Sequence, residues 1–286
     1  MPKSISLFLT MVALVACSGE SAVDAPPAGG DQPAGGQPTP VEAPELQLEL
    51  GTLLEKAQTN ALVPSPAEMQ KALNAAGIDT QLAQMVPDRS GLKMNVPNTD
   101  QAAVRTGVVL ADLLLTLSTA PKEKMVANLN QIKAGMAQLG GGDEIPAIID
   151  DLSAQIQNDA ISRDDLVKEL DELSGVLIPE IEYKAGEQVV PLIQAGSWLE
   201  GANLIASAME ASGKYDGADN LLKQPAVVEY FQKYVATEGA SKAPSDVIDQ
   251  LKGTLDTLGE ICAKEHLEEA DVKTIKSSTA SVLDLL

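Results

Sequence analysis

The chain has 286 residues, a formal net charge of −21, 44% hydrophobic residues and only 2% aromatic residues. The negative charge argues against nucleic acid, and against an anionic membrane surface, as a partner for the body of the protein. Because aromatic residues are so rare, the core has to be built from Leu, Ile, Val, Ala and Met. This composition favours closely packed helices over a β-sandwich.

The N-terminus has the features of a secretory signal. One basic residue, Lys3, precedes an apolar run over residues 5–16 that is too short for a permanent membrane-spanning helix. The run ends in Leu14-Val15-Ala16-Cys17, which resembles the lipobox of bacterial lipoproteins. The resemblance implies that residues 1–16 are removed as a signal peptide and that the Cys17 thiol receives a diacylglycerol. The alternative is an ordinary secretory signal in which this cysteine is incidental.

Lipidation would fix the protein to a membrane. Each acyl CH₂ group buried in a bilayer contributes about 0.8 kcal/mol, so several chains give an essentially permanent anchor. Ser18 follows the cysteine. In lipoproteins of bacteria with two membranes, a serine at this position resembles the signal for sorting to the outer membrane. We therefore expect the protein at the periplasmic face of the outer membrane.

Residues 17–43 are expected to be the lipidated cysteine and a disordered tether, because Pro, Gly and Ala dominate the segment. Residues 44–286 are expected to form one all-α globular domain of about ten helices. Apolar spacing of three and four residues predicts helices over residues 45–64, 66–75, 102–118, 121–139, 145–156, 163–179, 189–209, 218–222, 225–236, 245–261 and 267–286. Asp79 can cap a short turn that runs to Val86. Turn residues throughout 87–97 predict a loop.

Two of these helices, 102–118 and 189–209, are apolar on most faces and should lie at the centre of the fold. The segment that begins at Gly196 echoes the one that begins at Gly107, at an offset of 89 residues. We hypothesise that the two helices are equivalent members of a duplicated helical half and pack against each other. The helix around Trp198 also resembles a glycine-aromatic-glutamate helix of uncharacterised helical lipoproteins, a resemblance that implies no known activity.

The two central helices carry charged side chains that need partners. Arg105 and Asp112 lie on one face of the first helix, about 10 Å apart along its axis. One interpretation is structural pairing with neighbouring helices. The other is a polar ligand site in which Arg105 and Asp112 join side chains of the second helix, namely Trp198, Glu200 and Asn203.

The sequence shows no catalytic constellation and predicts neither a metal site nor a cofactor. His266 is the single histidine, which excludes a multi-histidine metal site. Cys262 is the only cysteine besides Cys17, and its helical context predicts a buried, inert thiol. We therefore expect a non-enzymatic envelope lipoprotein that binds a protein or envelope component. The alternative is a helical carrier or sensor of a small polar or amphipathic ligand.

Overall fold

The computed structural model describes residues 66–89, 91–142, 144–186, 189–237 and 245–286, which contain eleven α-helices and no strand. The all-α prediction is confirmed for this part of the chain. The predicted signal peptide (1–16), tether (17–43) and first helix (45–64) lie outside the described residues. The helices are α2 (Pro66–Ala76), α3 (Asp79–Met85), α4 (Thr99–Thr116), α5 (Lys122–Gln138), α6 (Glu144–Gln157), α7 (Arg163–Ala185), α8 (Val189–Ser212), α9 (Ala218–Leu222), α10 (Pro225–Thr237), α11 (Ser245–Cys262) and α12 (Glu269–Leu283).

Local sequence signals set many of the helix ends. The side chain of Asn98 caps α4 by accepting hydrogen bonds from the backbone N–H groups of Asp100 and Gln101. Ser162 caps α7 in the same way, through the N–H of Asp165. Such caps satisfy backbone donors that have no partner within the helix. Gly140 follows α5 with φ +80°, a conformation that favours glycine and that ends the helix.

The end of α7 differs from the prediction. The expected stop at Pro179 is wrong, because α7 continues to Ala185 and is capped by Gly186 with φ 101°. A proline inside a helix removes its own N–H donor and its ring crowds the carbonyl group of the preceding turn, a cost that a long helix can bear. The residues on both sides of it keep helical hydrogen bonding, so the proline does not end this helix.

Helices α4 and α8 pack against each other through their glycines. A Cβ atom at Gly107 would lie 1.8 Å from the carbonyl oxygen of Ile193, and one at Gly196 would lie 1.9 Å from that of Val104. A shift of 89 residues turns one contact into the other, because Gly107 corresponds to Gly196 and Val104 to Ile193. The predicted packing of the two helices is therefore confirmed.

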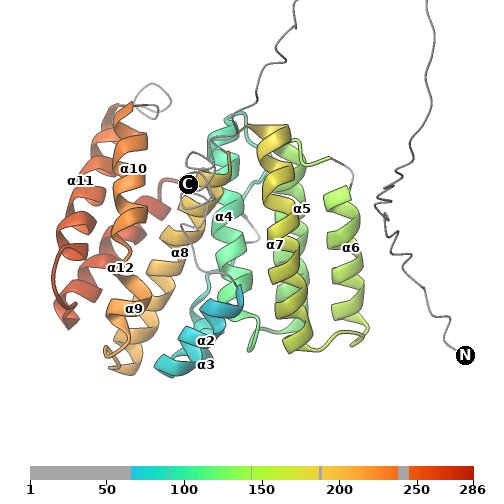
Figure 1. The fold of residues 1–286 in the computed structure, drawn as a ribbon, viewed down its shortest axis with the longest axis horizontal. Helices are drawn as coiled ribbons and strands as arrows, with labels where there is room; N and C mark the ends of the chain where they lie inside the picture. Colours follow the sequence, from blue (N-terminus) through green and yellow to red (C-terminus); the bar gives the residue numbers. More distant parts are fainter. Residues whose placement is uncertain (1–65, 90, 143, 187–188, 238–244) are drawn as a thin grey trace, which may run out of the picture. The chain divides into compact units, whose positions relative to one another are not determined.

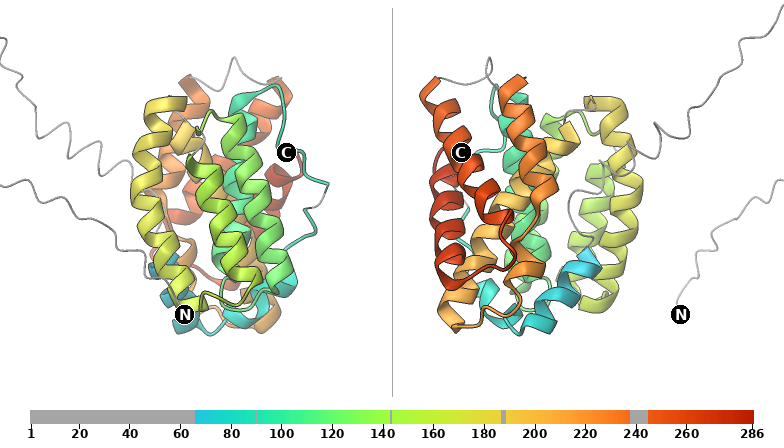
Figure 2. Two further views of the ribbon diagram at one scale, coloured as in Figure 1. Left: turned by 90° about the vertical axis from the view of Figure 1, so that its right-hand side faces the viewer. Right: turned by 60° about the vertical axis from the view of Figure 1, so that its left-hand side comes forward.

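Two hydrophobic cores share α4 and α8 (Figures 1 and 2). The N-terminal core combines α4, α5, α6, α7 and the first turn of α8. The C-terminal core combines the rest of α8 with α2, α3 and α9 to α12, together with Ala111 and Leu115 of α4. Figure 1 shows α5 to α7 on one side of the α4 and α8 pair and α10 to α12 on the other.

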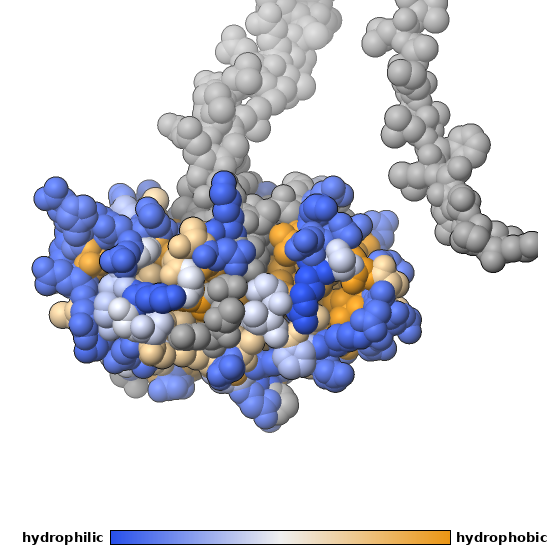
Figure 3. Space-filling view, turned by 90° about the horizontal axis from the view of Figure 1, so that it is seen from below, coloured by the Kyte–Doolittle hydropathy of each residue, from blue (hydrophilic) through white to orange (hydrophobic). Residues whose placement is uncertain are grey.

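The surface of the described residues is mostly hydrophilic. Figure 3 shows charged and polar side chains over most of the lower face, with hydrophobic side chains between them. Of the large hydrophobic side chains whose placement is described, only Tyr183 and Leu285 are exposed. None of the helices in this part of the chain has the length and hydropathy needed to cross a membrane.

Candidate functional site

Three charged side chains meet inside the protein between α4 and α8. Asp112 of α4 and Glu200 of α8 are fully buried, with exposed side-chain fractions of 0% and 1%. Arg89, from the loop before α4, reaches between them. Its Nε donates to Asp112 Oδ2 at 3.0 Å, and its second guanidinium nitrogen lies 2.5 Å from Glu200 Oε2. One cation therefore forms ion pairs with two buried carboxyl groups.

The charges in this cluster do not balance if both acids are ionised. Burial and, next, the negative charge of Glu200 raise the pKa of Asp112, Arg89 offsets part of the rise, and the resulting pKa is about 8. Burial also lowers the pKa of the Arg89 guanidinium, but the two carboxylates outweigh this effect and the net change is upward. At neutral pH the cluster thus holds one proton and is close to neutral.

The proton also explains the hydrogen bonding of the cluster. Among the described residues, Asp112 Oδ1 and Glu200 Oε1 are buried without a donor. The Glu200 carboxyl raises the pKa of Asp112 through its charge and through a side-chain hydrogen bond to it. Ionised carboxylates only accept hydrogen bonds, so this contact forms only when one of them is protonated. The pair therefore works as an acid and its conjugate base, both bound to one guanidinium.

Arg105 does not join this cluster. Its guanidinium donates to the carbonyl oxygen of Lys93 at 2.6 Å and to that of Leu286. It therefore ties α4 to the preceding loop and to the last residue of the chain. Arg105 and Asp112 therefore bond to different partners, and the structure places both in contacts with neighbouring segments, as the structural interpretation predicts.

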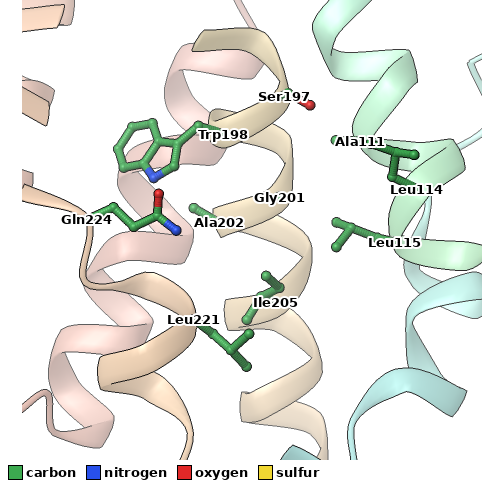
Figure 4. Close-up of a pocket in the computed structure, with 10 residues that line it drawn as sticks. All are labelled: Ala111, Leu114, Leu115, Ser197, Trp198, Gly201, Ala202, Ile205, Leu221 and Gln224. Atoms are coloured by element: carbon green, nitrogen blue, oxygen red, sulfur yellow. The ribbon is translucent and has the colours of Figure 1, made fainter. Parts of the chain in front are cut away.

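Trp198 lines a small cavity beside the cluster. The cavity has a volume of about 30 Å³, room for one or two water molecules. Figure 4 shows it between α4, α8 and the end of α9, with Trp198 and Gln224 on the same side. The indole is buried, and its Nε1 has no hydrogen-bond partner among the described residues. Neither Asp112 nor Glu200 lines this cavity.

Asn203 faces another neighbour. Its amide donates to the carbonyl oxygen of Lys276 at 2.9 Å and to the hydroxyl of Thr279 at 3.1 Å. It thus fastens α8 to α12. Of the five residues predicted from the sequence, the structure brings only Asp112 and Glu200 together. The remaining three, Arg105, Trp198 and Asn203, each lie at a different place and contact different neighbours.

Arg89 is the residue that the sequence analysis missed. It lies among turn residues in the 87–97 loop, and helical periodicity says nothing about such a segment. One signal was available. Two acids in helices that are otherwise apolar require a cation, and few basic residues lie near these helices in the sequence.

The remaining reactive side chains have structural contacts. Cys262 is buried, as predicted, and burial raises the pKa of its thiol. His266 does not pair with it, since its Nδ1 lies 2.9 Å from Asp219 Oδ2. That contact and a bond from the backbone N–H of Leu267 lower the pKa of Asp219. No group of three potential metal ligands gathers among the described residues.

An open groove lies between α11 and α12. Its volume is about 340 Å³, and its walls are uncharged. Hydroxyl and amide side chains and one glycine form these walls: Gln250, Gly253, Thr254, Thr257, Ser277, Ser278 and Ser281. The groove is thus polar, in contrast to the apolar groove that a hydrophobic partner helix would need.

Comparison of the chain with known protein families, with curated proteins and with solved structures finds no match.

Proposed function

We propose that this protein is a lipoprotein of the bacterial cell envelope, anchored by Cys17, whose helical domain binds a protein or another envelope component and catalyses no reaction. The observation that carries the proposal is the Leu14-Val15-Ala16-Cys17 motif at the end of a short apolar run. Ser18 supports a position at the outer membrane, facing the periplasm.

The geometry of the charged cluster favours a binding surface over an internal ligand site. Arg89 occupies the space between Asp112 and Glu200, so the acids already have a cation. A site for a small molecule usually has a volume of about 300 Å³ or more. The cavity at Trp198 provides about a tenth of this volume. Recognition would therefore take place on the outer helical surface.

The anchor is tested by metabolic labelling of the full chain with an alkyne analogue of palmitate, followed by membrane fractionation. Cys17→Ala should lose both the label and the membrane association. Cys262→Ala is the matched control, because it removes the only other cysteine of the chain and should keep both. Label that persists in Cys17→Ala would refute the lipoprotein assignment.

The binding role is tested by mild crosslinking of the anchored protein in its native host, followed by mass spectrometry. We expect a protein or envelope polymer in stoichiometric amount. The second candidate, a carrier of a small polar or amphipathic ligand, is favoured by the unpartnered Nε1 of Trp198 at its cavity. A bound small molecule that is lost in Trp198→Ala, without a macromolecular partner, would support the carrier instead.

A further inference from the structure

The cavity beside Trp198 combines one buried hydrogen-bond donor with apolar walls. Its volume is about 30 Å³. Apart from Ser197, Trp198 and Gln224, the described residues that line it are all Ala, Gly, Leu or Ile, and none of them is charged. The polar groups of the cavity therefore determine what it can hold.

The indole nitrogen of Trp198 lacks an acceptor. The side chain has an exposed fraction of only 5%, and Nε1 has no hydrogen-bond partner within the described part of the chain. An indole N–H can only donate, and a buried tryptophan usually finds a partner for it. A buried donor without a partner loses the hydrogen bond that it forms with water in the unfolded chain. An acceptor that enters the cavity from solution would restore this bond.

Gln224 supplies a second polar group on the same side of the cavity. It lies between α9 and α10 and is half-buried. Figure 4 shows the indole nitrogen directed toward the side-chain amide of Gln224, whereas the hydroxyl group of Ser197 points toward α4. The indole and the amide do not bond to each other, because Nε1 has no partner. An oxygen atom between them would accept from the indole and bond to the amide, which both donates and accepts.

Gly201 leaves room for such a molecule. It lies inside α8, where alanine would be the better helix former. The close contact of α4 and α8 requires Gly107 and Gly196, because a Cβ atom there would lie within 2 Å of a carbonyl oxygen. At Gly201 a Cβ atom would meet only Leu115 Cδ1, at 3.8 Å, which is an ordinary contact. Packing of the described residues therefore does not require this glycine, and its missing side chain keeps the cavity wider.

The size and the walls of the cavity define the class of ligand. Because the volume corresponds to one or two water molecules, a ligand has at most about three non-hydrogen atoms. An ion would lose its hydration without meeting an opposite charge, which is costly. The apolar walls accept a methyl group, whereas the indole requires an acceptor atom. The ligand is thus a small, uncharged molecule with an oxygen atom.

We propose that the cavity binds one such molecule, whose oxygen accepts the hydrogen bond of Trp198 Nε1 and contacts the Gln224 amide. Water and a short alcohol such as methanol share this chemistry. The bound molecule joins α8 to the segment between α9 and α10. The site does not depend on the lipid anchor or on the macromolecular partner proposed above.

NMR spectroscopy of the purified full chain tests the site. Trp198 is the only tryptophan of the sequence, so the indole N–H gives a single signal. Cross-peaks from this proton to water would be recorded in paired NOESY and ROESY spectra. Opposite signs identify a bound molecule, whereas equal signs identify proton exchange with the solvent. We expect opposite signs.

Titration with methanol distinguishes the two sources of the oxygen atom. A cross-peak from the methanol methyl group to the indole proton, together with loss of the water cross-peak, would show that the site accepts an alcohol. A water cross-peak that methanol leaves unchanged would show that the site is specific for water. Either result supports the site. Absence of a bound-molecule cross-peak from both water and methanol would overturn it.

Variants exclude other origins of the signal. Gly201→Ala places a methyl group in the cavity and should lose the bound-molecule cross-peak while the indole signal persists. Gly253→Ala makes the same substitution inside α11, where a Cβ atom meets nothing within 4 Å, and should keep the cross-peak. Ser197→Ala should also keep it, because the signal does not pass through the Ser197 hydroxyl.

Gln224→Leu provides a second route to the same test if Gly201→Ala does not fold. It removes the polar contact opposite the indole and should weaken the cross-peak several-fold. The proposal is also overturned if the cross-peak keeps its wild-type intensity in Gly201→Ala, or if it is lost in Ser197→Ala.

Discussion

The two central helices are alike where they touch and different in what surrounds them. Each contributes a glycine that lies against the backbone of the other, and each contributes one buried acid to the Arg89 cluster. Outside this contact, α4 packs mainly on α5, the next helix in the chain. Helix α8 packs mainly on α12, near the end of the chain.

Duplication of a helix can account for the contact between α4 and α8, but it does not account for the helices that surround each of them. The glycine contacts exchange under one sequence offset, as expected for two copies of one helix. The helices that cover each copy follow a different order, so the duplication hypothesis is limited to the α4 and α8 pair. The N-terminal core is built from consecutive helices, whereas the C-terminal core depends on contacts between residues far apart in the sequence.

The largest expected effect comes from removing the cation that both helices share. Arg89→Met leaves Asp112 and Glu200 buried without a counter-ion, and breaking a buried ion pair typically costs about 3–5 kcal/mol. We expect this loss in the free energy of unfolding, measured by urea titration at pH 7.

Lys133→Met is the control for Arg89→Met, because Lys133 forms a more exposed ion pair with Asp150. Such pairs contribute about 1 kcal/mol or less. If Arg89→Met lies within 1 kcal/mol of the wild type, the two acids do not need this cation.

The glycine contact predicts nearly equal losses on the two helices. Gly107→Ala and Gly196→Ala would each place a methyl group within 2 Å of a carbonyl oxygen of the other helix. The backbones must separate, and we expect each to lose about 3 kcal/mol in free energy of unfolding. Strongly unequal losses would show that the reciprocal packing is not energetically equivalent.

Gly253→Ala provides the matched control for these substitutions. Gly253 lies inside α11, and a Cβ atom there would meet nothing within 4 Å. Alanine is the better helix former, so this variant should gain about 0.5–1 kcal/mol. A loss instead would mean that glycine at this position serves the groove between α11 and α12.

Periodicity and turn chemistry predicted most of the helices, because each signal acts within a few residues. The short helix α9 was predicted with its observed bounds, and α5 was predicted over residues 121–139 from the spacing of its apolar residues, close to its observed bounds. The central position of α4 and α8 followed from their apolar faces. The failure at Pro179 shows the limit of a local rule, since a helix can tolerate one lost hydrogen bond.

The candidate site was predicted only in part, because its assembly depends on long-range contacts. Asp112 and Glu200 stood out as acids in apolar helices. The rotation of each helix and the path of the loop that carries Arg89 decide which partner each charge meets. Sequence spacing gives neither, so Arg105 and Asn203 were grouped with side chains that they do not contact, and Arg89 was missed.

Another prediction concerns the pH dependence of stability. The pKa of Asp112 is about 8 in the folded protein and about 4 in the unfolded chain. Its contribution is fully present below pH 4 and is lost as the pH rises toward 8, by at most about 1.4 kcal/mol per unit. Acids with lowered pKa, such as Asp219, act in the opposite direction. The test is therefore the difference between wild type and Asp112→Asn, measured by urea unfolding at several pH values, and a difference that does not vary with pH would contradict the assignment.

The smallest expected effect compares the start of α4 with the start of a peripheral helix. Asn98→Ala removes the side chain that accepts from the N–H groups of Asp100 and Gln101, and Ser162→Ala removes the corresponding cap of α7. Each should cost about 1 kcal/mol in urea unfolding. Asn98 also ends the loop that carries Arg89, so its loss should increase hydrogen exchange in that loop, whereas Ser162→Ala should leave that exchange unchanged. Equal exchange in the two variants would show that this loop is held by Arg89 and by its hydrogen bonds from α5 and does not depend on the cap of α4.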